Sequence, residues 1–241
     1  MKSQRRHELK TNPLAVWVER IIRQVQPYWK LITAAVVVIA VVWLGTLILK
    51  ARHEARLEQG WDRLFAILRD EHLNQLIQQL QEDEQTKDLR PEEQRREALA
   101  RLAEQLDAVA QAYADTPVAT YAQVELGDIY YALGLSYLFQ DVEEARKYLD
   151  RAVESYQQAT TTRVTEPQLV PRARFGLAQA LEARGRSSRD DSPHDWQRAQ
   201  QEYELLTRSP SIYHPLAQAR LDAMQRGRFH EWFWEMAEAE P

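Results

Sequence analysis

The chain has 241 residues, of which 28% are charged and 44% belong to the hydrophobic set. Only 7 glycines are present, and strong helix formers dominate, so the composition favours an all-α protein. Cysteine is absent, so the fold needs no disulfide and suits either side of a membrane. The net charge of -5 combines a basic beginning with an acidic remainder, which argues against nucleic acid as the partner of the larger part.

Residues 1–30 form a basic segment that carries seven Lys or Arg against two Glu. Its apolar residues fall on one helical face, which predicts a short amphipathic helix that ends at Pro27. We interpret this helix as lying on anionic lipid, with packing on a partner subunit as the alternative. The residues of the apolar face are Leu14, Trp17, Val18, Ile21, Ile22 and Val25.

Leu31–Leu49 is an uncharged stretch that predicts a transmembrane helix. At about 1.5 Å rise per residue it measures roughly 28 Å, close to a hydrocarbon core of about 30 Å. A cleaved signal peptide is the alternative, but the 30-residue lead and the apolar stretch are too long for one, and no small-x-small site follows. Because Lys and Arg are concentrated before the stretch, the positive-inside rule predicts a cytoplasmic N-terminus and residues 50–241 outside the cytoplasm.

Residues 50–90 are predicted to form a long helix that leads into the rest of the chain. Apolar residues recur there at helical spacing from Leu57 to Leu80, which indicates one amphipathic helix over 57–80. No proline lies between Pro27 and Pro91, so the sequence leaves open whether this helix continues the membrane anchor.

Residues 91–227 show further helical stripes separated by prolines. Proline is tolerated at the first helical position, because its missing N–H has no partner inside the helix. Five prolines precede apolar stripes in this way: Pro91, Pro117, Pro171, Pro193 and Pro215. Polar residues predict N-caps, and glycines predict C-caps. These caps are Thr116, Asp141 and Ser192 at helix starts, and Gly185 and Gly227 at helix ends.

A repeat underlies the stripes and matches the tetratricopeptide (TPR) pattern twice. Small residues of this pattern let two helices approach closely, and larger residues fill the groove between them. The expected fold is therefore all-α, with one N-terminal transmembrane helix followed by a TPR-like α-solenoid of about three helix pairs plus a capping helix. The residues predicted to pack the repeats are Leu126, Gly127, Tyr130, Ala145, Leu149 and Ala152 in the first match, and Leu177, Ala178, Leu181, Ala199 and Tyr203 in the second.

Residues 228–241 form an aromatic C-terminal tail. It contains Phe229, Trp232, Phe233 and Trp234, and aromatic residues are enriched in the centres of interfaces. We expect this tail either to cap the exposed end of the solenoid or to contact a partner or a membrane surface.

The sequence carries none of the short motifs of nucleotide, metallohydrolase or nucleophile sites, so we expect no enzyme, no cofactor, no metal and no small-molecule substrate. A loop cluster of Asp190, Asp191, His194 and Asp195 is the one candidate for a divalent cation. We prefer a structural explanation, in which Ser192 caps a helix and Asp195 faces the positive end of its dipole.

The run from Thr120 to Gly134, TYAQVELGDIYYALG, resembles the corresponding segment of the YfgM-type TPR proteins. That family is the ancillary, chaperone-linked subunit of the bacterial Sec translocon. The resemblance implies a single-pass protein of the bacterial inner membrane, with a cytoplasmic N-terminus and a periplasmic TPR domain. It also implies translocon subunits, chaperones or their clients as partners, and no catalytic residues. The chain departs from the family in its longer basic tail, its loop at 186–194 and its aromatic C-terminus.

Two functions are consistent with these features. The first is a membrane-anchored protein–protein interaction module, ancillary to protein translocation or periplasmic chaperoning. The alternative is a structural scaffold or assembly subunit of an envelope complex, which self-associates through the helix expected at 57–80.

Overall fold

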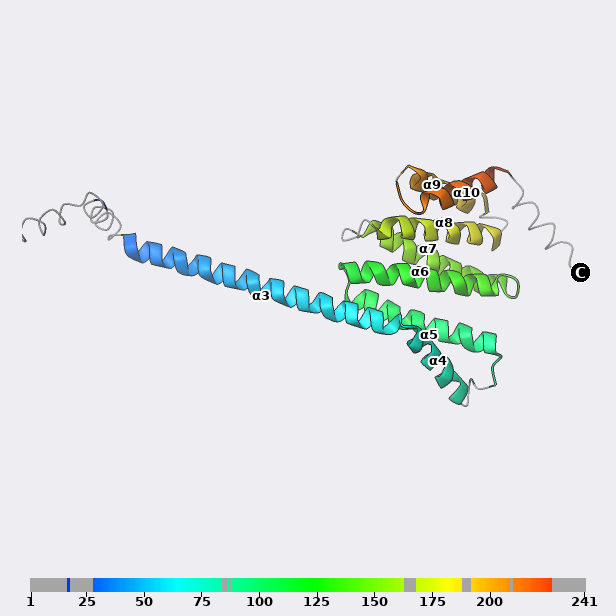
Figure 1. Cartoon of the computed structure of the whole chain (residues 1–241), viewed down its shortest axis with the longest axis horizontal. Helices are drawn as coiled ribbons and strands as arrows, with labels where there is room; N and C mark the ends of the chain where they lie inside the picture. Colours follow the sequence, from blue (N-terminus) through cyan, green and yellow to red (C-terminus); the bar gives the residue numbers. More distant parts are fainter. Residues whose placement is uncertain are drawn as a thin grey trace, which may run out of the picture. The chain divides into compact units, whose positions relative to one another are not determined.

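A computed structural model describes residue 17 and residues 28–83, 86, 88–162, 168–187, 192–208 and 210–226. Every regular element in these ranges is a helix, as the composition predicts. The chain divides into two compact units, Met1–Arg56 and Leu57–Pro241 (Figure 1). The amphipathic helix expected near Leu14–Val25 and the tail with Phe229, Trp232, Phe233 and Trp234 lie outside the described residues, apart from Trp17.

Helix α3 spans Trp29–Ile67 and contains the apolar stretch Leu31–Leu49. It is long and apolar enough to cross a membrane. Two hydroxyls inside this stretch bond to the helix backbone, Thr33 Oγ1 to the Trp29 carbonyl at 2.8 Å and Thr46 Oγ1 to the Trp43 carbonyl at 2.7 Å. Neither hydroxyl would therefore meet lipid without a hydrogen bond.

The single helix expected over 57–80 is wrong, because α3 ends at Ile67 and α4 spans Asp70–Glu82. Arg69 separates them with an extended backbone, φ −69° and ψ 136°. The reason is that the apolar stripe would move to a different face of a continuous helix. Leu68 and Leu73 are separated by five positions, which turn an α-helix by about 500°, so the second half of the stripe is rotated by about 140° from the first. A break lets both halves face the core, where Leu64 and Leu80 are fully buried.

The remaining helices follow one another with short connections. They are α5 (Pro91–Ala112), α6 (Pro117–Tyr137), α7 (Val142–Thr161), α8 (Leu169–Ser187), α9 (Ser192–Thr207) and α10 (His214–Gln225). Each helix from α4 onward packs on the next one in the chain, and α6 also packs on α8. Figure 1 shows α5 to α9 side by side in chain order.

Most of the predicted helix starts are confirmed. Pro91 and Pro117 are the first residues of their helices. The Thr116 hydroxyl accepts a hydrogen bond from the Ala119 amide at 3.4 Å, and the Asp141 carboxylate accepts one from the Glu144 amide at 3.0 Å. Pro171, by contrast, lies two residues inside α8, which begins at Leu169.

The helix end predicted at Gly185 is wrong. Gly185 is a buried residue inside α8, which continues to Ser187. The ion pair between Arg186 and Glu182 joins residues four positions apart and needs a helical backbone through residue 186. Gly185 therefore does not terminate the helix, and Gly227 lies outside the described residues.

The core of the Leu57–Pro241 unit consists of two clusters of buried apolar side chains. The first joins the end of α3 to α4, α5 and α6, and the second joins α6 to α7, α8, α9 and α10. Because α6 contributes to both clusters, through Leu126 to the first and Val124 to the second, it lies at the centre of this unit.

The connection from α5 to α6 contains Asp115, which has φ 60°. L-residues other than glycine seldom adopt this left-handed conformation. We expect Asp115→Gly to raise the free energy of unfolding by about 0.5 kcal/mol, since glycine removes the strain but enlarges the freedom of the unfolded chain. Urea unfolding of the full chain in detergent measures the change. Asp141→Gly is the matched control and should lower stability slightly, because it removes an N-cap at an extended residue. A lower free energy of unfolding for Asp115→Gly would contradict this explanation.

Candidate functional site

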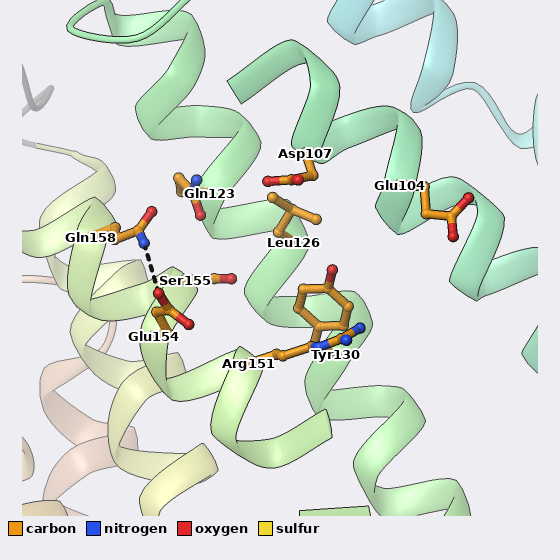
Figure 2. A pocket seen from close by; sticks show the side chains of 9 residues that line it. All are labelled: Glu104, Asp107, Gln123, Leu126, Tyr130, Arg151, Glu154, Ser155 and Gln158. Carbon is orange, nitrogen blue, oxygen red and sulfur yellow. Dashed lines mark hydrogen bonds between the residues drawn. The ribbon is translucent and has the colours of Figure 1, made fainter. Parts of the chain in front are cut away.

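A cavity of about 400 Å³ lies on the surface of α6 where α5 and α7 flank it (Figure 2). Each helix contributes one stripe of side chains at helical spacing, so the three stripes meet in one place. The lining residues are Glu104 and Asp107 from α5, Gln123, Leu126 and Tyr130 from α6, and Arg151, Glu154, Ser155 and Gln158 from α7.

The lining of this pocket is mainly polar and carries an excess of negative charge. Its carboxylates are Glu104, Asp107 and Glu154, and Arg151 is the cation in the lining. Gln111 donates to Asp107 at 2.7 Å, and Gln158 donates to Glu154 at 3.3 Å. Both donors are neutral amides. None of the three carboxylates forms an ion pair within the part of the chain that the structure describes.

Tyr130 closes one end of the pocket. The guanidinium of Arg151 lies over its ring, 5.7 Å from the centroid. Burial raises the pKa of the Tyr130 phenol against the opposing effect of Arg151, and the negative charges of Asp107 and Glu104 add to the rise. The phenol therefore keeps its proton at neutral pH and can donate a hydrogen bond into the pocket.

A ladder of aromatic rings continues from Tyr130 away from the pocket. Tyr130 stacks with Tyr148 at 6.4 Å between centroids, and Tyr148 stacks with Tyr137 at 5.6 Å. Arg96 of α5 covers Tyr137 at 4.5 Å. Because the ladder joins α5, α6 and α7, it holds the walls of the pocket in place.

Polar contacts around the buried Tyr156 join α7 to α6 and α8. Tyr156 of α7 donates its hydroxyl to Asp128 of α6, and Arg172 of α8 binds the same carboxylate at 2.5 Å. Arg172 also pairs with Glu125 of α6 at 2.8 Å. Burial raises the pKa of Tyr156, and the nearby Asp128 carboxylate raises it further. Burial also raises the pKa of Glu125, against the opposing effect of Arg172.

A second network joins α8 to α9 and α10. Glu182 is buried and accepts a hydrogen bond from the Tyr203 hydroxyl at 3.1 Å. Its other oxygen meets Arg186 and lies 3.7 Å from Arg220 of α10. Burial and the Glu182 charge raise the pKa of Tyr203. The Tyr203 phenol therefore remains the hydrogen-bond donor, and the Glu182 carboxylate remains the acceptor.

In the loop considered for a divalent cation, the Asp195 carboxylate is bound by an arginine side chain. Arg184 binds both oxygens of Asp195, at 2.7 and 2.6 Å, and also pairs with Asp150 of α7 at 2.9 Å. His194 is exposed, and Asp190 and Asp191 lie outside the described residues. Asp195 thus has a guanidinium as its partner. Across the described ranges, no group of three or more His, Cys, Asp or Glu is placed to hold a metal ion.

The structure places the predicted repeat residues mostly in the core. All of them are buried except Tyr130, which is half-buried and lines the pocket. Leu126 is buried and forms part of the pocket lining.

Sequence reasoning missed the pocket itself and its three carboxylates. The available signal was the spacing of Arg151, Glu154 and Gln158 along one face of α7, but nothing local showed which helices would face it.

Comparisons with known proteins returned no family model, no curated protein and no solved structure that matches this chain.

Proposed function

We propose that the protein is a membrane-anchored protein-interaction module that presents the α5–α6–α7 pocket to a partner protein outside the cytoplasm. The observation that carries the proposal is this pocket, in which α5 and α7 supply three carboxylates that form no ion pair among the described residues. A pocket of this kind on the surface of a helical stack offers charge and hydrogen bonds to another chain.

The helical stack is proposed to be a TPR-like solenoid. Helices α4 with α5, α6 with α7, and α8 with α9 would form its three pairs, and α10 would form its cap. The contact between α6 and α8 supports this view, since the first helices of successive TPR units pack on each other. Buried small residues at the helix contacts, such as Gly127, Ala152 and Ala178, support it as well.

The apolar stretch Leu31–Leu49 is proposed to anchor the module in a bacterial inner membrane. The charge asymmetry on either side of the stretch supports a cytoplasmic N-terminus and a periplasmic position for residues 50–241. Anchoring keeps the pocket at a high effective concentration near other membrane-bound chains. By resemblance to the YfgM-type proteins, the partners would be translocon subunits, chaperones or emerging clients.

Self-association as a scaffold is the second candidate. Its support is the aromatic cluster of Trp61 and Phe65 on α3 with Tyr121 on α6. Phe65 remains 50% exposed at its edge, so a second copy of the chain would have an apolar contact point there. The helix break at Arg69 limits such a contact to the last turns of α3.

Photo-cross-linking in native membranes tests both candidates. A photoreactive residue at Gln123 or Gln158 in the full chain is expected to capture a translocon subunit or a periplasmic chaperone. The same residue at Gln75, an exposed position on α4, is the control and should capture neither. Mass spectrometry identifies the products. Capture restricted to a second copy of the chain, through a probe at Phe65, would replace the interaction module with the scaffold.

A further inference from the structure

We infer that the α5–α6–α7 pocket binds an arginine side chain presented by an extended segment of a partner protein. This inference rests on the proposed function and specifies what the pocket recognises. The pocket is lined by Glu104, Asp107 and Glu154, and its opposite walls belong to α5 and α7 (Figure 2). A ligand between these walls meets carboxylates on two sides.

The rest of the molecule shows how carboxylates between neighbouring helices are neutralised. Glu125 and Asp128 of α6 share Arg172 of α8. Glu202 of α9 pairs with Arg174 of α8 at 2.7 Å, and Asp195 of α9 pairs with Arg184 at 2.6 Å. At each of these contacts an arginine of α8 supplies the positive charge.

The α5–α6–α7 contact departs from this pattern. Within the described part of the chain no guanidinium reaches its carboxylates, and Arg151 instead lies over the Tyr130 ring. Asp107 and Glu154 take their hydrogen bonds from Gln111 and Gln158. The place that an arginine fills at the other contacts is therefore open to solvent here, and a partner chain can supply it.

The shape and polarity of the pocket favour guanidinium over ammonium. A guanidinium has five donors in one plane and matches carboxylates on two walls, whereas an ammonium acts as a compact, strongly hydrated charge. The cavity of about 400 Å³ also has room for adjoining backbone. The side chains of Gln123, Ser155 and Gln158 provide both donors and acceptors for the peptide groups of an extended segment.

Removing the charge of Arg151 should change the affinity for an arginine peptide in the opposite direction to removing a carboxylate. Arg151 is the cation in the lining, so its charge opposes the entry of another cation. Arg151→Gln should strengthen the binding of an arginine peptide, and Glu154→Gln or Asp107→Asn should weaken it. A general loss of structure would weaken binding in every variant, and it cannot produce opposite signs.

The experiment uses the full chain in phosphatidylcholine nanodiscs, whose zwitterionic surface does not attract a cationic peptide. The probe is the fluorescein-labelled peptide Ser-Ala-Pro-Arg-Ala-Arg-Pro-Ala-Ser, with its Kd measured by fluorescence anisotropy. Matched peptides carry lysine or the uncharged isostere citrulline in place of both arginines. Glu143→Gln on the exposed first turn of α7 is the control for net charge, and thermal melting verifies that each variant folds.

We expect Glu154→Gln and Asp107→Asn each to weaken binding about fivefold, and Arg151→Gln to strengthen it about threefold. Glu143→Gln should leave Kd unchanged, the citrulline peptide should not bind, and the lysine peptide should bind more weakly than the arginine peptide. Equal binding of the lysine peptide, equal effects of Glu143→Gln and Glu154→Gln, or displacement by stoichiometric spermidine would overturn the inference.

The outcomes also separate the inference from the proposed function. If Gln123 and Gln158 cross-link a translocon subunit or chaperone while the arginine peptide does not bind, the interaction module stands and the arginine specificity is wrong. If the peptide binds in the expected order but these positions capture no partner in native membranes, the proposed function fails.

Discussion

Replacing Gly176 with alanine is expected to lower the free energy of unfolding by about 3 kcal/mol, and Gly127→Ala should have a similar effect. Gly127 on α6 and Gly176 on α8 both contact the ring of Tyr156 on α7. A Cβ atom at Gly127 would lie 2.5 Å from the ring, and one at Gly176 would overlap it as closely. Alanine is the better helix former by about 1 kcal/mol, so the loss must come from this overlap.

The Tyr156 ring has no room to move away from either new methyl group. The backbone of the other glycine also contacts the ring, and the Tyr156 hydroxyl is held by Asp128, which Arg172 also binds. Tyr156 is 1% exposed, so a shifted ring would also disturb its other neighbours in the core. Adjustment therefore requires α6, α7 and α8 to separate, which costs packing along the whole contact.

A double-mutant cycle measures this effect by chemical unfolding of the full chain in detergent. In a Tyr156→Leu background the ring is absent, and Gly176→Ala should then become neutral or stabilising. Gly45→Ala is the matched control, because a Cβ at Gly45 has nothing within 4 Å. An equal loss of stability from Gly176→Ala with and without the ring would refute the steric explanation.

Arginine at both Val38 and Val42 is expected to release the protein from the membrane. Each charge near the middle of a transmembrane helix opposes insertion by about 3 kcal/mol, and these two side chains lie one turn apart on α3. Both are more than half exposed in the structure, so the substitutions disturb no packing within the described residues.

Alkaline carbonate extraction of membranes distinguishes integral from released protein. The same substitution at Leu31 and Leu49, the two ends of the apolar stretch, is the control. Arginine there can extend to the lipid headgroups, so this variant should remain in the pellet. Retention of the Val38→Arg/Val42→Arg chain in the pellet would mean that something other than Leu31–Leu49 holds the protein to the membrane.

The features that the sequence predicted correctly are those that depend on neighbouring residues. That Leu31–Leu49 lies in a helix long and apolar enough to cross a membrane requires only length and hydropathy, and the helix starts at Pro91 and Pro117 require only local backbone chemistry. The burial of the small residues in the TPR-like pattern follows from helical periodicity. The break between α3 and α4 is also encoded locally, in the five-residue step from Leu68 to Leu73.

The features that only the tertiary structure decided are contacts between side chains distant in sequence. Arg172 and Asp128 are 44 positions apart, and Tyr156 and Asp128 are 28 apart, so no local pattern pairs them. Gly176 and Gly127 matter because both meet the same ring. The pocket likewise requires stripes from α5, α6 and α7 to face one another. Periodicity determines which residues share a face of one helix, whereas the packing of whole helices determines which faces meet, and that choice makes the pocket.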